Sequence, residues 1–236
     1  MGEKVIVFDI WGDYAYFRRG YTSTSTISYP FPSRTTISGL IAGILGLEKN
    51  SYHDIFNEEN SKFGLRIINP IKKININLNY INTKEGFILS DIKNNLRVQV
   101  QAEFLKDVKY RIYVSLKDNK LMEDLYSNLR QHKSVYTPCL GISECIANFK
   151  LAYDEILDLI PMDGDDIYID SIILKDKYEL VVEPKKRYGV IKSPGFMNYN
   201  RIVSKFIEYY YEKNGSSIKI KNGEYFLIGD DKVVLF

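Results

Sequence analysis

The sequence predicts an α+β protein with a ferredoxin-like core and a β-rich C-terminal extension. Up to about residue 150, hydrophobic periodicity gives the order strand, helix, strands, helix, strand, which is the βαββαβ pattern of ferredoxin-like folds. The rest of the chain is rich in strand patterns separated by short turns. No composition break, internal repeat or Pro/Ser-rich linker divides the 236 residues. We therefore expect one compact chain rather than two separate domains.

The chain begins with a strand, a polar loop and an apolar helix. The run VIVF at residues 5–8 has the composition of a buried strand. A polar loop is expected from Gly12 to about Pro32. Ser33 then occupies an N-cap position, because apolar residues repeat at helical spacing directly after it.

Two glycines of this helix, Gly39 and Gly43, are four residues apart and therefore lie on one face. A helix face without side chains allows a close approach of another element. We expect this face to pack tightly on the sheet.

The following segments alternate in the manner of strands before a second helix. The predicted strands are 63–70, 72–82, 96–105 and 108–116. A helix is expected at 121–129, and a loop followed by a strand at 139–152. Near the C-terminus, the dipeptide Asn222-Gly223 lies between two apolar runs and predicts a two-residue hairpin turn.

Charge is distributed unevenly, although the formal net charge is only +2. Residues 14–38 contain three arginines and no acid, and residues 184–205 contain six basic residues and no acid. Residues 70–117 hold nine basic and four acidic residues, a balance of +5. In contrast, residues 152–170 hold seven acids and no base. This pattern predicts a polarised surface with basic faces.

Signals for catalysis, metals and cofactors are weak. Cys139 and Cys145 have no partners at zinc-finger spacing, and we interpret them as a thiol pair in a reducing cytosol. The segment 162–170, MDGDDIYID, resembles the start of a calcium loop, but Leu174 stands where the bidentate Glu belongs. We therefore expect a solvated turn there. His132 directly follows a helix, and a histidine at a helix C-terminus usually interacts favourably with the helix dipole. No metal or cofactor is expected.

The loop 12–34 is the best candidate for a binding site. Backbone amides at a helix N-terminus attract phosphate, and aromatic side chains stack on splayed bases. The loop and helix start supply hydroxyls, one guanidinium and three aromatic rings, from Ser33, Thr35, Thr36, Arg34, Tyr21, Tyr29 and Phe31. The alternative is a Ser/Thr-rich turn with its aromatic residues folded beneath it as core.

Three stretches resemble one known family. The segment 8–47, FDIWGDYAYFRRGYTSTSTISYPFPSRTTISGLIAGILGL, is similar to the N-terminal signature of the CRISPR-associated protein 5 family, especially its type I-B branch. YTPCLGISEC at 136–145 and YYYEKNGSSIKIKNGEYFLI at 209–228 resemble further parts of that family. The resemblance implies a modified RNA-recognition-motif core in residues 1–155. It also implies an inserted β-hairpin thumb at about 74–103, and a C-terminal extension, 156–236, packed on the core.

The same resemblance implies a cytoplasmic subunit of Cascade, the surveillance complex guided by CRISPR RNA. Such a subunit caps one end of the complex and holds the 5′ handle of the guide. Its partners are CRISPR RNA, the backbone and large subunits and, through the complex, target DNA, with no membrane. Carried onto this chain, the handle and thumb contacts are Arg18, Arg19, Tyr21, Thr22, Ser33, Arg34, Thr35, Lys93, Arg97 and Gln99.

Two other functions compete with this interpretation. The type I-C branch of the family cuts its precursor RNA with Tyr, Lys and His. For these roles this chain offers His132 and Lys133, with Tyr14, Tyr16 or Tyr21 as the tyrosine. That would make it a metal-independent endoribonuclease. The second alternative is a protein-interaction module whose basic face binds no RNA. Because a separate endonuclease usually processes the RNA in type I-B systems, we expect a binding protein without catalytic residues.

Overall fold

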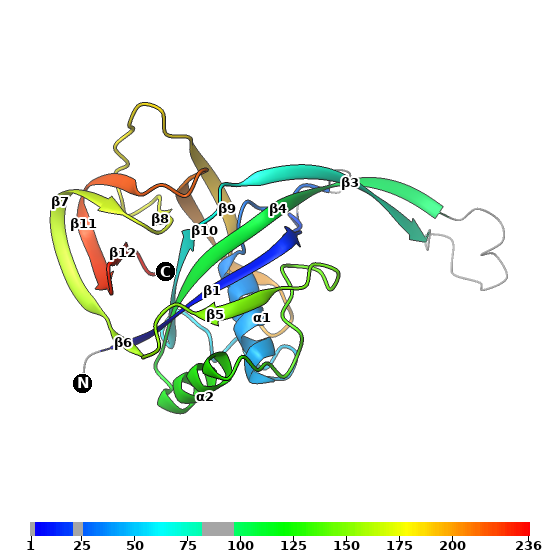
Figure 1. The fold of residues 1–236 in the computed structure, drawn as a ribbon, viewed down its shortest axis with the longest axis horizontal. Coiled ribbons are helices and arrows are strands. Elements are labelled where there is room, and N and C mark those ends of the chain that lie inside the picture. Colours follow the sequence, from blue (N-terminus) through cyan, green and yellow to red (C-terminus); the bar gives the residue numbers. More distant parts are fainter. Residues whose placement is uncertain (1–2, 21–25, 82–96) are drawn as a thin grey trace.

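The computed structural model describes residues 3–20, 26–81 and 97–236. Two helices and twelve strands are present in these ranges (Figure 1). In chain order they are β1 (Lys4–Ala15), α1 (Arg34–Leu45), β2 (Ser61–Ile67), β3 (Lys72–Ile81), β4 (Arg97–Leu116), α2 (Asn119–Arg130), β5 (Asn148–Leu151), β6 (Leu157–Asp158), β7 (Ile160–Ile169), β8 (Ile173–Leu174), β9 (Tyr188–Met197), β10 (Val203–Glu212), β11 (Ile218–Ile228) and β12 (Asp231–Val233). No helix in these ranges is long and apolar enough to cross a membrane.

The central sheet has the ferredoxin-like topology that the sequence predicts. Its strands follow the order β2-β4-β1-β5, and all these neighbours are antiparallel. The connection through α1 skips β4, and the connection through α2 skips β1, so two βαβ crossovers interleave. β3 is inserted between the second and third core strands, and among the described strands it pairs with β4 alone. The fold is therefore α+β with a modified RNA-recognition-motif core.

Both faces of the central sheet are covered. Alternate residues of β1 point to opposite faces. Ile6, Phe8 and Ile10 lie in the main core with the buried residues of the two helices. Val5 and Val7 lie in a second cluster, together with residues of β11 and β12. The C-terminal strands therefore cover the sheet face opposite the helices, at the end of β1 where the chain starts.

The C-terminal part forms two further three-stranded sheets, β8-β10-β9 and β12-β11-β7. The predicted hairpin at Asn222-Gly223 is wrong, because β11 continues through it and pairs with Asp165 and Gly164 of β7. Gly223 has φ of 143°, a backbone conformation that glycine adopts readily and other residues rarely do. The acidic segment 162–170, predicted as a solvated turn, lies mostly within β7 for the same reason.

Helix α1 begins at the predicted residue. The Ser33 side chain accepts a hydrogen bond from the Thr36 backbone N–H, as an N-cap does. The helix ends at Gly46, which has φ of 77° and donates its backbone N–H to the Ala42 carbonyl. The loop before α1 is shorter than predicted, because β1 continues past Gly12 to Ala15.

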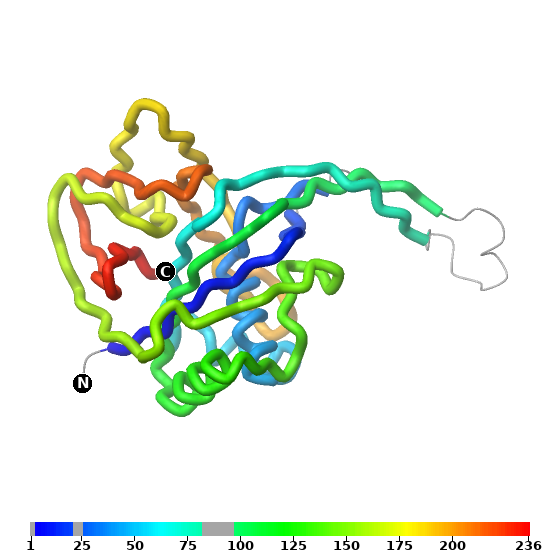
Figure 2. The backbone as a smooth tube through the Cα atoms, viewed as in Figure 1, coloured from blue at the N-terminus to red at the C-terminus, as the bar shows by residue number. Residues whose placement is uncertain are grey.

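Strand β4 is the longest element, with 20 residues from Arg97 to Leu116. The sequence predicts two strands here, but the chain continues through Asp107, which has φ of 52°. One half of β4 pairs with β1 and β2, and the other half pairs with β3. The β3–β4 hairpin projects from the body of the molecule at the position predicted for the thumb (Figures 1 and 2). The middle of the predicted thumb, residues 82–96, lies outside the described residues.

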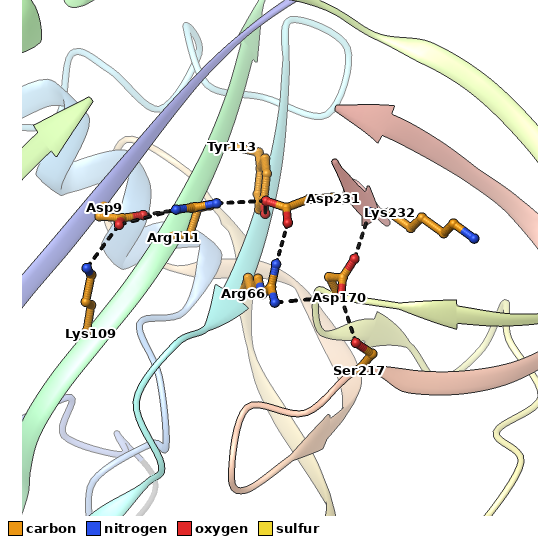
Figure 3. Close-up of polar contacts among 9 residues, drawn as sticks. All are labelled: Asp9, Arg66, Lys109, Arg111, Tyr113, Asp170, Ser217, Asp231 and Lys232. Atoms are coloured by element: carbon orange, nitrogen blue, oxygen red, sulfur yellow. Dashed lines mark hydrogen bonds and ion pairs between the residues drawn. The ribbon is translucent and has the colours of Figure 1, made fainter. Parts of the chain in front are cut away.

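A network of ion pairs joins the C-terminal strands to the central sheet (Figure 3). The Asp231 carboxylate on β12 accepts hydrogen bonds from Arg111 at 3.0 Å and from the Tyr113 hydroxyl at 2.6 Å. It also pairs with Arg66 of β2. Arg111 in turn donates to Asp9 of β1 at 2.8 Å. Burial opposes the charge of Arg111, but the two carboxylates outweigh it and raise the pKa of this arginine.

Candidate nucleic-acid interface

The acid-free segment after β1 folds back on itself as a short ribbon, which we define as residues 16–20 and 26–29. Tyr29 donates its backbone N–H to the Phe17 carbonyl at 2.8 Å, and Arg19 donates to the Ile27 carbonyl at 3.1 Å. Arg18 pairs with Ser28 in an antiparallel bridge. The ribbon therefore presents two consecutive arginines from a fixed backbone.

The two arginines of the ribbon differ in environment. Arg18 is exposed, and it forms no ion pair within the described ranges. Arg19 is half-buried: its Nε donates to the Ser28 carbonyl at 3.3 Å, and its guanidinium lies 5.5 Å from the centre of the Tyr29 ring. The predicted contacts Tyr21 and Thr22 lie outside the described residues. Arg18 is thus the most accessible of the described ribbon cations.

The ribbon is attached to the base of the β3–β4 hairpin. Tyr16 stacks on Phe104 of β4 with ring centres 4.8 Å apart. The Thr26 carbonyl accepts a hydrogen bond from the Glu103 backbone N–H at 2.9 Å, and the Thr26 hydroxyl bonds to the Gln101 carbonyl. Burial raises the pKa of the Tyr16 hydroxyl, which keeps it protonated at neutral pH. Ribbon and hairpin therefore form one continuous surface.

The hairpin has one apolar and one polar face. Paired positions on one face carry apolar residues, among them Tyr80 opposite Val98 and Leu78 opposite Val100. Tyr80 is 47% exposed and Val98 is 44% exposed, so this face is open to solvent. The other face carries amide pairs and a basic end, with Asn77 opposite Gln101, Asn79 opposite Gln99, and Arg97 as the first residue of β4. The predicted contacts Gln99 and Arg97 share this polar face, and Lys93 lies outside the described residues.

The Arg34 side chain, predicted to contact RNA, is buried in the protein instead. The residue is only 1% exposed. Its guanidinium donates to the carbonyls of Phe56 at 2.8 Å and Ser61 at 3.0 Å, and lies 4.0 Å from the centre of the Phe196 ring. Burial lowers its pKa to about 10, so it stays charged at neutral pH. Arg34 is therefore a core residue that holds the segment after α1.

The other residues at the start of α1 divide between core and surface. Ser33 is buried and caps the helix, and its hydroxyl also lies 3.0 Å from that of Thr35. Thr35 is half-buried at the surface. Tyr29 and Phe31, considered as stacking platforms, are 4% and 1% exposed. For these two rings, the alternative of aromatic residues folded beneath the loop is correct.

A cleft of about 630 Å³ runs along one face of α1. The glycine face of α1 lies in it: Gly39 and Gly43 are half-buried and border the cleft instead of packing on the sheet, which corrects the prediction. Three other segments supply its walls, namely Tyr52 and His53, residues 136–139 with Gly141, and Met197 with Arg201. Their sequence signals are the family-like stretch 136–145 and the acid-free segment 184–205, neither of which indicates a cleft.

The residues suggested for catalysis do not form a cluster with a tyrosine hydroxyl in the described contacts. His132 stacks on the Phe149 ring at 4.8 Å, and the Lys133 ammonium donates to the Gln131 side chain at 2.8 Å. Cys139 and Cys145 are free thiols, and burial raises the pKa of both. Within the described ranges, no group of three or more His, Cys, Asp or Glu residues could hold a metal ion.

Fold and site together define a protein with a modified RNA-recognition-motif core, whose second core strand is followed by a projecting hairpin joined to an arginine-bearing ribbon. The family model described as CRISPR-associated protein (Cas_Cas5) matches residues 5–188. The chain belongs to this family. The match covers the ribbon, both helices and the hairpin, and it confirms the family resemblance of the sequence.

Two solved structures are similar to this chain at low sequence identity. A CRISPR protein from Archaeoglobus fulgidus is 15% identical, with a TM-score of 0.59 and 98% of each chain covered. A chain of a CRISPR RNA-guided surveillance complex is 13% identical, with a TM-score of 0.49, and the similarity covers 95% of this chain and 91% of that one. No curated protein matches the sequence. The first of these structures supports the fold, and assignment to the type I-B branch stays a prediction.

Proposed function

We propose that the chain is a non-catalytic subunit of a type I CRISPR surveillance complex, and that it binds the 5′ handle of CRISPR RNA. The observation that carries the proposal is the junction of ribbon and hairpin. It places the exposed Arg18 beside a two-faced hairpin, on a chain of the CRISPR-associated protein 5 family. A guanidinium neutralises phosphate, and apolar and aromatic side chains accept unstacked bases. Such a surface suits single-stranded RNA.

The proposal includes the setting of the protein. The partners are CRISPR RNA, a backbone subunit, a large subunit and, through the complex, target DNA. The complex works in the cytoplasm, and the type I-B branch is the proposed subtype. An RNA-recognition motif stacks bases on an open face of its sheet. Here β11 and β12 pack over part of the face opposite the helices, which supports RNA binding at the ribbon and hairpin instead.

Replacing Arg18 with alanine tests the phosphate contact. We expect weaker binding to a repeat-derived 5′ handle RNA. The slope of log K against log salt should fall in magnitude by about 0.7, because one phosphate contact is lost from a single strand. Fluorescence anisotropy with a labelled handle RNA at several salt concentrations measures both effects. Lys120→Ala removes an exposed cation from α2 and serves as the matched control. An unchanged slope in Arg18→Ala would exclude Arg18 from the site.

The absence of cleavage is a separate prediction. We expect unprocessed repeat RNA to stay intact when incubated with the purified protein in EDTA. The physical reason is that general acid–base cleavage needs a base and a proton donor together, and His132 is stacked on Phe149 instead. Denaturing gel electrophoresis of the RNA measures the outcome. Specific cutting at the 5′ side of the handle, lost in His132→Ala, would establish the nuclease alternative.

A further inference from the structure

The cleft beside α1 has the form of a slot between two tyrosines. At its floor, Gly43 accepts a hydrogen bond from the Tyr136 backbone N–H at 3.0 Å, and a Cβ at Gly43 would lie 4.0 Å from the Tyr136 Cβ. One turn earlier, a Cβ at Gly39 would lie 3.4 Å from the Tyr52 hydroxyl. The floor therefore consists of glycine backbone at the two points nearest to Tyr136 and Tyr52. Its volume of about 630 Å³ is within the range of small-ligand sites.

The charge of the slot favours an anion. Arg201 is the one charged side chain among its described lining residues, which include no carboxylate. His53 also lines the slot, and burial lowers the pKa of its imidazole. The Nε2 atom of His53 is buried and has no hydrogen-bond partner in the described part of the chain. Thr35 and Thr36 add hydroxyls at the start of the helix. These groups can donate to phosphate or to base edges, and the tyrosines can stack on a base.

The slot is continuous with the ribbon. Pro138, Cys139 and Gly141 form part of its wall. Within the same segment, the Leu140 carbonyl accepts a hydrogen bond at 2.9 Å from the backbone N–H of Tyr16, which follows β1. Gly141 approaches so closely that a Cβ there would lie 2.0 Å from the Tyr16 carbonyl oxygen. A strand of RNA that contacts the ribbon can therefore follow this wall into the slot.

We propose that this slot receives one nucleotide of the bound RNA, with its base beside Tyr136 and its phosphate toward Arg201. The inference rests on the proposed RNA-binding function and adds a second contact region to it. Arg201 belongs to the turn between β9 and β10, where its backbone N–H donates to the Asn198 carbonyl at 2.9 Å. The turn fixes the arginine at the rim of the slot, with φ of 61°.

Filling the slot tests the proposal without removing a contact. Gly43→Leu places a side chain over the floor, and leucine favours a helix more than glycine does, so α1 is retained. We expect handle binding about tenfold weaker, the size of one lost base-stacking contact. Gly43→Ala is the matched control, because its Cβ makes only an ordinary contact and leaves the slot open. Circular dichroism and thermal melting check that both variants are folded.

A scan of abasic handle RNAs locates the nucleotide. Each RNA in the scan carries one abasic nucleotide. At one position the abasic nucleotide should weaken binding to the wild-type chain, and the same RNA should show no such loss with Gly43→Leu. Arg201→Gln should lower the salt slope by about 0.7 if the phosphate lies beside it.

The outcomes separate the two proposals. A wild-type chain that binds no handle RNA overturns the proposed function and, with it, the slot. A wild-type chain that binds RNA while Gly43→Leu binds equally well, with an unchanged abasic profile, overturns the slot alone. Normal RNA binding by Gly43→Leu with failed assembly onto other subunits would assign the slot to a protein segment and also overturn the proposal.

Discussion

Replacing Arg34 with alanine is expected to lower the free energy of unfolding by about 4 kcal/mol, because buried polar partners are left unsatisfied. The guanidinium is the donor for the carbonyl oxygens of Phe56 and Ser61 and for the Ser61 hydroxyl. It also lies between the rings of Phe63 and Phe196, at 4.7 and 4.0 Å from their centres. Alanine removes the donors and opens a cavity between the two rings.

Urea unfolding monitored by circular dichroism measures this effect. Arg34→Lys keeps a charge but not the planar fork, and is expected to recover only part of the loss. Arg18→Ala is the matched surface control, because Arg18 is exposed, and its stability should stay within about 0.5 kcal/mol of the wild type. If Arg34→Ala unfolds at the wild-type urea midpoint and instead lowers the salt slope of RNA binding, the original assignment of Arg34 to phosphate is restored.

Replacing Asp231 with alanine is expected to cost about 3 kcal/mol of unfolding free energy. The carboxylate is 7% exposed and is shared by Arg66, Arg111 and the Tyr113 hydroxyl. Its removal leaves two partly buried guanidinium groups without their common partner (Figure 3). Because the network links β12 to the central sheet, the C-terminal strands should loosen before the core unfolds.

Asp230→Ala is the matched control, since this neighbouring carboxylate is exposed. Hydrogen exchange measured by mass spectrometry distinguishes the two variants: faster exchange in β11 and β12 is expected for Asp231→Ala and not for Asp230→Ala. Equal exchange and equal urea midpoints in the two variants would show that the network contributes little to the attachment of the C-terminal strands.

Local sequence signals predicted the core of the fold well. The apolar run at 5–8, the N-cap at Ser33 and the helical spacing at 121–129 each depend on interactions within a few residues. They therefore correspond to elements found at those places. The order of these elements was enough to predict the ferredoxin-like topology, because right-handed crossovers leave few arrangements of such a chain.

Tertiary pairing overrode the local signals elsewhere. Asn222-Gly223 has the composition of a tight turn, yet β7 pairs with β11 from Ile218 to Leu227, and this outweighs the turn preference. The two strands predicted at 96–105 and 108–116 merge because β3 and β1 hydrogen-bond to successive parts of the same strand. No signal within either segment reveals which distant strand will pair with it.

The candidate site shows the same division. Arg18 is exposed as its polar surroundings predict, whereas Arg34, in the same acid-free stretch, is buried against a ring more than 160 positions away in Phe196. Gly39 and Gly43 were correctly placed on one helix face, but their partner proved to be a cleft whose walls come from residues 136–139 and Arg201. The spacing of residues in the sequence shows which of them share a helix face. Which residues pack against that face depends on the tertiary structure.

The unbroken course of β4 has an energetic consequence for ligand binding. The strand belongs to the central sheet at one end and to the projecting hairpin at the other, with no loop between them. The direction of the hairpin is therefore set when the sheet forms, and the entropy of orienting it is lost during folding rather than during association. A ligand that binds the hairpin therefore binds a rigid element. A force that the ligand exerts on the hairpin is transmitted along β4 to β1 and β2 through their backbone hydrogen bonds.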